Sequence, residues 1–171
     1  SLHKGFIHLK PTASFAPIAH GGQIYAFQAT DAFRTGFEMD VNFQRGKSLF
    51  KTTSSILGQW ALETGLGLPF TPPLDLFNSY SHLMAENLTI TFRHRAIAPS
   101  YILARNEDFT EGVSLLGCEL KLNSKKGSFH FEVDNILNRS WLDHISAYRA
   151  LGLVTQGRWW LLSWSKDIKN N

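Results

Sequence analysis

Hydrophobic and polar residues alternate at every second position along most of this chain, which is the pattern of β-strands with two different faces. In residues 37–43 (FEMDVNF), large apolar side chains occupy the odd positions, and acidic or amide side chains occupy the even ones. The same alternation recurs in residues 88–93, 116–122 and 129–134, and near the end of the chain in residues 160–164. The sequence therefore predicts an all-β chain.

These alternating segments, with turn-forming residues between them, predict eight strands. Their expected bounds are residues 4–10, 23–43, 47–60, 73–83, 87–97, 112–122, 127–136 and 157–165. Three connections are tight turns at residues 44–46, 84–86 and 123–126, which all fall at one end of the sheet. The other connections are long and carry most of the proline. They fall at the opposite end of the sheet, because successive connections of antiparallel strands alternate between the two ends. One short segment, residues 141–148, is the only candidate for a helix, and no glycine caps it.

Such a regular alternation of short and long connections is typical of an antiparallel transmembrane β-barrel, with short periplasmic turns and longer extracellular loops. Strands of ten or more residues exceed the usual five or six and are long enough to cross a bilayer at a tilt. Trp159 and Trp160 at one end of the last strand, and Trp164 at the other, fit aromatic belts at the two membrane interfaces. A soluble, lipocalin-like barrel of eight strands stays an alternative, because alternation alone does not say which face contacts water. The loop asymmetry favours the membrane barrel.

Composition narrows the classes of function. The 171 residues carry a net charge of +3 that is scattered along the chain, whereas a nucleic-acid-binding surface gathers its basic residues. Charged residues make up only 18% and aromatic residues 13%, so a large apolar surface has to be placed. Cys118 is the only cysteine, which excludes an internal disulfide framework. The chain begins at Ser1 without a methionine or a signal segment, so we expect a processed protein or a fragment of a longer one.

Five segments, in order along the chain, carry a family resemblance. They are residues 23–38 with Asp-Ala and then Gly-Phe-Glu, residues 68–73 with Leu-Pro and Pro-Pro, Asn106-Glu107, residues 134–146 with Asp-Asn-Ile-Leu-Asn and then Trp-Leu-Asp-His-Ile-Ser, and Gly157-Arg158. Together they resemble the C-terminal β-barrel region of TonB-dependent outer-membrane receptors. The chain departs from that family at residues 110–113, where Thr-Glu-Gly-Val replaces the usual Thr-Pro-Gly-Tyr.

The resemblance implies a barrel of about 22 strands with a plugged lumen, of which these eight strands would be the last. Residues 1–171 would then be the C-terminal barrel segment, and the plug domain, through which such receptors contact the TonB complex, would be absent from this chain. The implied function is uptake across the bacterial cell outer membrane of an iron chelate, such as a siderophore or a haem-like compound, or of another scarce nutrient. The barrel would contact outer-membrane lipid, and its extracellular loops would bind the small-molecule substrate.

The seven histidines show no metal-ligand spacing. They are His3, His8, His20, His82, His94, His130 and His144. We expect polar lumen or loop residues rather than ligands, with His8 and His130 facing the lumen. His144 belongs to a family-like segment, and we expect it to form a structural hydrogen bond that fixes the last loop.

Two carboxylates, Glu38 and Asp40, lie on one strand face about 7 Å apart. They could form an acid–base pair, but we interpret them as a lumen-facing polar row, paired with Arg34 or Lys51. The sequence contains no nucleophile elbow and no phosphate-binding glycine loop, and no catalytic, cofactor-binding or metal-binding residue is predicted. We therefore expect a transport protein rather than an enzyme.

The candidates for substrate contact are the four long loops, residues 11–22, 61–72, 98–111 and 137–156, in which no motif marks a single ligand residue. Two other functions stay open at this stage. One is a self-contained eight-stranded outer-membrane barrel with a structural or lipid-modifying role. The other is a soluble barrel that binds a small ligand, which predicts purification without detergent.

Overall fold

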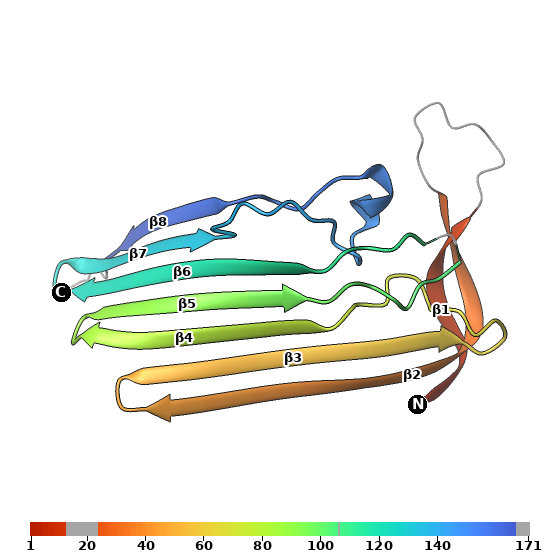
Figure 1. Cartoon of the computed structure of the whole chain (residues 1–171), viewed down its shortest axis with the longest axis horizontal. Coiled ribbons are helices and arrows are strands. Elements are labelled where there is room, and N and C mark those ends of the chain that lie inside the picture. Colours follow the sequence, from red (N-terminus) through yellow and green to blue (C-terminus); the bar gives the residue numbers. More distant parts are fainter. Residues whose placement is uncertain (13–23, 106, 167–171) are drawn as a thin grey trace, which may run out of the picture.

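The chain forms one antiparallel sheet in which strands that are neighbours in sequence are also neighbours in space (Figure 1). The computed structural model describes residues 1–12, 24–105 and 107–166. Within these ranges the strands are β1 (Leu2–Thr12), β2 (Ile24–Arg45), β3 (Ser48–Ala61), β4 (Asp75–Ala85), β5 (Leu88–Ile97), β6 (Val113–Ser124), β7 (Gly127–Asp134) and β8 (Trp159–Ser165). The all-β prediction is confirmed, and no helix in these ranges is long and apolar enough to cross a membrane.

Every predicted strand is present, and each bound agrees with the prediction to within two residues. The predicted strand at 127–136 is nevertheless too long, because β7 ends at Asp134. The next residue, Asn135, has a positive φ of 49°, a left-handed conformation that cannot continue a strand. Its side chain bonds the backbone N–H and carbonyl of Arg139, which closes a local turn.

The one candidate for a helix, residues 141–148, does not form an α-helix. Residues 141–146 are irregular, and a single turn of 3₁₀ helix covers Ala147–Leu151. Ser146 Oγ accepts a hydrogen bond from the Tyr148 N–H and caps the start of this turn. Gly152, at a φ of 67°, caps its end, so the glycine stop lies one short turn later than the expected helix.

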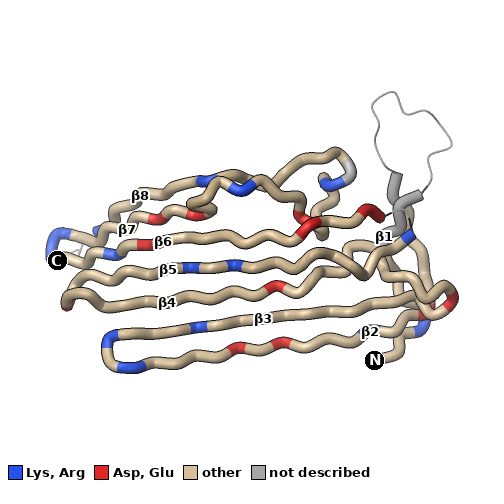
Figure 2. The backbone as a smooth tube through the Cα atoms, in the orientation of Figure 1, with Lys and Arg blue, Asp and Glu red and all other residues tan. Residues whose placement is uncertain are grey.

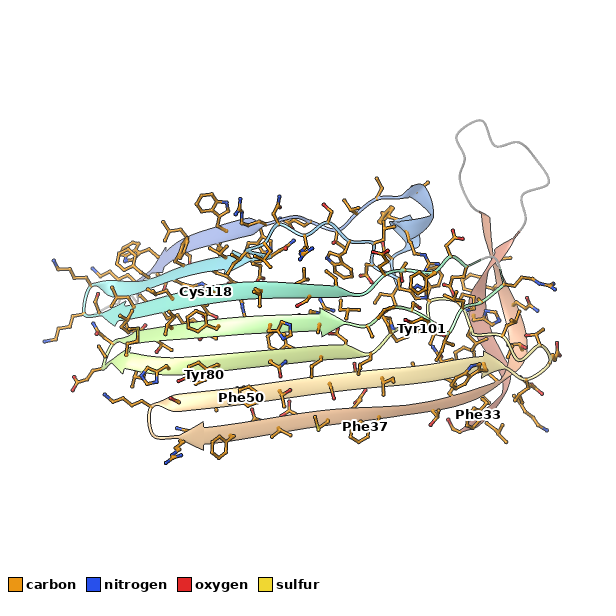
Figure 3. All side chains as sticks on the ribbon, in the orientation of Figure 1. Phe33, Phe37, Phe50, Tyr80, Tyr101 and Cys118 are labelled. Atoms are coloured by element: carbon orange, nitrogen blue, oxygen red, sulfur yellow. The ribbon has the colours of Figure 1, made fainter. Side chains whose placement is uncertain are left out.

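The strand registers divide the side chains into two faces. Direct partners such as Phe43 and Phe50, then Phe50 and Tyr80, then Tyr80 and Phe92 carry one set across β2 to β5. We call this set the apolar face: Phe37, Met39, Val41, Phe43, Phe50, Ile56, Tyr80, Phe92, Leu116, Cys118, Leu120, Phe129, Phe131, Val133, Trp160, Leu162 and Trp164. Figure 3 labels four of its members on β2, β3, β4 and β6. The alternate positions, which carry most of the charged residues of the strands, form the polar face.

The apolar face has no second layer to cover it. Among the described residues, Ala32 and Leu68 are the only buried hydrophobic side chains. Trp160 and Leu162 are 75% and 74% exposed, and Phe37 is 61% exposed. A water-soluble domain buries such a face against a second sheet or against helices, so this sheet does not have the layered core of a soluble protein.

Trp159 does not belong with the other two tryptophans of β8. It pairs with Asp134, while Trp160 pairs with Val133 and Trp164 with Phe129. Trp160 and Trp164 therefore lie on the apolar face near the two ends of β8. Placing Trp159 in the same belt is wrong, because adjacent strand residues point to opposite faces.

The connections separate by length between the two ends of the sheet, as predicted. The turns β2–β3, β4–β5 and β6–β7 lie together at the left of Figure 1, and the longer connections β3–β4, β5–β6 and β7–β8 lie at the right. We call these the turn end and the loop end. Lys47, Lys125 and Lys126 lie in the turns, so the turn end is basic (Figure 2).

The sheet is open rather than closed into a barrel. The strand order runs from β1 to β8, and no pairing joins these two edges among the described residues. β1 pairs only with the half of β2 that leads from the loop end, between Ile24 and Phe33. The outer edge of the remaining half of β2 therefore offers backbone donors and acceptors to a further strand.

Candidate functional site

A network of ion pairs crosses three strands of the polar face, β5, β6 and β7, whose charged positions are coloured along the backbone in Figure 2. Arg93 of β5 pairs with Glu132 of β7 at 2.7 Å and with Asp134 of β7 at 2.9 Å, and reaches Glu119 of β6 at 3.9 Å. Glu119 in turn pairs with Lys121 at 2.6 Å. The Arg93 side chain is only 18% exposed, so these carboxylates offset the cost of removing its charge from water.

His130 completes this network from β7. Its Nε2 atom lies 3.2 Å from Glu119 Oε1 and 3.4 Å from Glu132 Oε2. The predicted position of His130 on the polar face is therefore confirmed. His8 is directly opposite Gln28 on the same face, also as predicted.

The absence of a side chain at Gly117 makes room for the network. A Cβ atom at this position would overlap Asp134 Oδ1 and would lie only 3.2 Å from Arg93 Nε. Gly117 sits directly opposite Arg93 in the register of β5 and β6. Glycine in a strand often marks such a close approach, and here it lets the Arg93–Asp134 pair cross over β6.

A second ion pair, between Arg95 and Asp75, lies nearer to the loop end. Three contacts of 2.6–3.1 Å join the guanidinium to both carboxylate oxygens, and both side chains are partly exposed. This pair lines a concave pocket of about 570 Å³ on the polar face. Other lining residues are Phe77, Arg93, Asp134, Trp141 and Trp159. The pocket thus combines aromatic surfaces with charges of both signs, which suits a ligand that has apolar and polar parts.

At the loop end of the sheet, a buried cluster joins three of the long connections. Glu107 lies between β5 and β6, and its side chain is fully buried. Its Oε1 accepts hydrogen bonds from the Phe70 N–H at 3.0 Å and from Arg149 Nη2 at 2.9 Å. Its Oε2 accepts from the Ala104 N–H at 2.9 Å. One carboxylate therefore connects the β3–β4, β5–β6 and β7–β8 loops.

His144 extends the cluster. Its Nδ1 atom lies 2.8 Å from Arg149 Nη1 and 3.0 Å from Thr110 Oγ1, and its side chain is 1% exposed. Burial lowers the pKa of His144 below its ordinary value, and the Arg149 charge lowers it further, against the opposing effect of Glu107 and Asp143. The predicted structural hydrogen bond of His144 in the last loop is confirmed, with Nδ1 bonded to Arg149 of the same loop and to Thr110. We call Glu107, Thr110, His144 and Arg149 the loop hub.

Comparisons with known proteins place the fold. No protein-family model matches the sequence, and no curated protein matches it. Solved structures do match. The copper transporter OprC superimposes on 93% of this chain with a TM-score of 0.78 at 15% sequence identity.

The likeness to OprC is one of fold. The chain spans about a quarter (26%) of the OprC chain. At this identity the match carries no residue of OprC over to this sequence, and it says nothing of a shared cargo. It does show that a similar arrangement of the chain forms part of a longer chain, that of OprC.

Of the two carboxylates singled out in the sequence, Asp40 has other partners than expected. Asp40 Oδ1 accepts from Asn42 Nδ2 at 2.6 Å, and Asp40 Oδ2 accepts from Thr53 Oγ1 at 3.0 Å. Within the described residues no ion pair joins Glu38 or Asp40 to Arg34 or Lys51, so that pairing is wrong. The polar row itself is present on the polar face, opposite Ser55 and Thr53 of β3.

Two histidines lie where the sequence did not place them. His82 and His94 fall on the same side of the sheet as Tyr80 and Phe92, by strand alternation, and not on the polar face. His94 belongs to a hydrogen-bonded row across β3 to β6: Thr52 to Asn78 at 2.7 Å, Asn78 to His94 at 3.5 Å and His94 to Ser114 at 2.9 Å. The row satisfies polar groups among themselves within an otherwise apolar surface. His20 and most of the first predicted loop, residues 11–22, lie outside the described residues.

Sequence reasoning missed most of the loop hub. It expected a structural hydrogen bond at His144, it named Glu107 only as part of a family-like segment, and it did not single out Arg149 or Thr110. The one signal for a contact was the chemistry of Glu107 and Arg149, two opposite charges in loops expected at the same end of the sheet.

Proposed function

We propose that this chain is part of the wall of an outer-membrane transport barrel. Its apolar face would contact lipid and its polar face would line an aqueous lumen. The observation that carries this proposal is the exposure of the apolar face, which no second layer covers. Lipid supplies the missing apolar contact, and between its two edges the sheet pairs its backbone groups strand to strand, as a membrane-spanning β-structure must.

The two ends of the sheet give the orientation. Short turns face the periplasm and long loops face the outside in barrels of this type. The turn end, with its lysines, would be periplasmic, and the loop hub and the pocket would lie toward the cell exterior. A molecule arriving from outside would therefore meet the hub loops before the pocket.

The open edges support membership of a larger barrel. A membrane sheet with unpaired edges leaves polar backbone groups in lipid, so further strands must pair with β8 and with the free half of β2. The family resemblance supplies an answer, a TonB-dependent receptor in which this chain is the last part of the wall. A separate plug would then fill the lumen and contact the TonB complex.

The cargo of such a transporter would pass along the polar face, and the pocket beside Arg95 and Asp75 is its candidate contact. Trp141 and Trp159 offer flat apolar surfaces, while Arg95 and Asp75 can each exchange their mutual ion pair for a ligand group. A small amphipathic molecule with charged groups fits this lining. The choice of an iron chelate rests on the resemblance alone.

Membrane insertion is the property to test first. We expect the chain, refolded from urea in detergent and transferred to phospholipid vesicles, to float with the vesicles in a density gradient. It should stay with them after a wash at high salt or alkaline pH and keep a β-sheet circular dichroism spectrum. Peripheral binding through the basic turn end would be lost in high salt, because screening weakens it.

The control is the same chain diluted into buffer without detergent or lipid, where we expect aggregation. A monomer with native β-structure in plain buffer would contradict the membrane assignment and favour the soluble ligand-binding barrel.

A further inference from the structure

The geometry of the loop hub fixes the protonation state of His144. Arg149 can only donate hydrogen bonds, so the Nδ1 atom 2.8 Å from its Nη1 must be an acceptor. The ring proton therefore sits on Nε2, on the side of Glu107 Oε1 at 3.6 Å. In this neutral form Arg149 keeps its acceptors, and the Nε2 proton is directed toward the Glu107 carboxylate, although it makes no hydrogen bond.

A second proton would go to Nδ1 and disrupt this arrangement. The new N–H would point at the Arg149 guanidinium, and two positive charges would then lie within hydrogen-bonding distance. Arg149 is held in place by Glu107 at 2.9 Å and by the His144 carbonyl at 2.6 Å, so both contacts would be strained together. Glu107 cannot relieve the conflict fully, because its oxygens also accept the Phe70 and Ala104 N–H groups.

We propose that the loop hub is a pH-sensitive latch, in which protonation of His144 releases Arg149 and detaches the β7–β8 loop from the β3–β4 and β5–β6 loops. The charged groups that face His144 come from two elements. Glu107 lies in the β5–β6 loop, and Arg149 and Asp143 lie in its own loop; the β3–β4 loop contributes the Phe70 ring, whose centroid is 5.8 Å from the Arg149 guanidinium. The latch concerns contacts within this chain and does not depend on the identity of any cargo.

The direction of the pH effect follows from linkage. In the closed latch the pKa of His144 is below 6.5, and in the open loop it returns to about 6.5. Proton binding therefore favours the open form, and the stability of the closed form is complete above about pH 6.5 and falls as the pH decreases from there. Loop opening should follow acidification rather than alkalinisation.

Hydrogen exchange on the folded, detergent-solubilised chain tests the latch. Between about pH 7.5 and about pH 5.5, amide exchange in residues 144–155, corrected for the intrinsic pH dependence, should accelerate about tenfold. Exchange in β4 and β5 should stay unchanged. If residues 144–155 exchange equally at the two pH values, or if the whole sheet accelerates with them, the proposal is overturned.

Two substitutions assign the effect to His144. In His144→Asn, the side-chain oxygen occupies the place of Nδ1, accepts from Arg149 and does not titrate, so the loop should stay closed at both pH values. His82→Asn, at the turn end, should behave like the unaltered chain. Acceleration that persists in His144→Asn would overturn the proposal, because another group, such as Glu107, would then be the trigger.

If His144→Asn opens the loop even at neutral pH, that variant cannot test the latch. Direct titration of the His144 ring in the unaltered chain then provides the test. The ring of His144 can be followed by NMR in the unaltered chain. Its midpoint should coincide with the midpoint of loop exchange, and a separation of more than about one pH unit would overturn the latch.

Discussion

Replacement of Glu107 by alanine should destabilise the loop end by about 3–5 kcal/mol, the cost of breaking a buried ion pair by removing one partner. The substitution leaves the Arg149 guanidinium, 11% exposed, without its carboxylate. It also leaves the Phe70 and Ala104 N–H groups without their acceptor. Because one carboxylate joins three loops, all three should loosen together, and their amide exchange and protease sensitivity should rise in parallel.

Asp108→Ala is the matched control for this substitution. Asp108 is the exposed neighbour of Glu107, so its loss should change stability by less than about 0.5 kcal/mol. Equal effects of the two substitutions, or loosening of the β5–β6 loop alone, would show that Glu107 does not hold the three loops together.

An arginine in place of Phe92 should reduce the stability of the folded chain in a bilayer by about 2–4 kcal/mol, the cost of a basic residue on the lipid face near the membrane centre. Phe92 is 51% exposed on the apolar face and pairs with Tyr80 and Cys118 across its two neighbouring strands. In lipid this position offers an arginine no counter-charge and no water. Urea titration of the vesicle-inserted chain measures the change.

Thr91 is one residue away and points to the opposite face. In Thr91→Arg, the new guanidinium lies opposite Glu119 in the register of β5 and β6, so it should be tolerated with a change below about 1 kcal/mol. Equal costs at positions 91 and 92 would mean that both faces meet the same medium, which the membrane assignment forbids.

Strand positions were predictable because alternation and turn chemistry are local properties of a sequence. Phe37 to Phe43 alternate without interruption, and Gly46, with a φ of 56°, closes the turn that follows β2. Exposure of the apolar face followed from the same alternation once the loop asymmetry was added. The end of β7 was missed because the conformation of Asn135 depends on bonds to Arg139, which alternation does not encode.

Contacts between loops were beyond the sequence for a different reason. Glu107 and Arg149 are 42 residues apart, and their pairing depends on the path of two irregular segments with no periodic signal. The sequence predicted that one face of the sheet is polar, but it did not predict which side chains of that face bond each other. Asp40 bonds Thr53 and Asn42 rather than a basic residue. The alternation within one strand does not show which residue of the next strand lies beside a given side chain.

Accessibility of spin labels along β6 tests the central claim, that the apolar face contacts lipid. With Cys118, the only cysteine, first replaced by serine, single cysteines are introduced in turn from Leu115 to Lys121 in the vesicle-inserted chain, leaving out Gly117, where a side chain would meet Asp134. Labels at 116, 118 and 120 should be reached by oxygen, which concentrates in lipid, and labels at 115, 119 and 121 by a water-soluble nickel complex. This two-residue alternation is the result that the account predicts. Uniform access of the nickel complex to all six positions would contradict it.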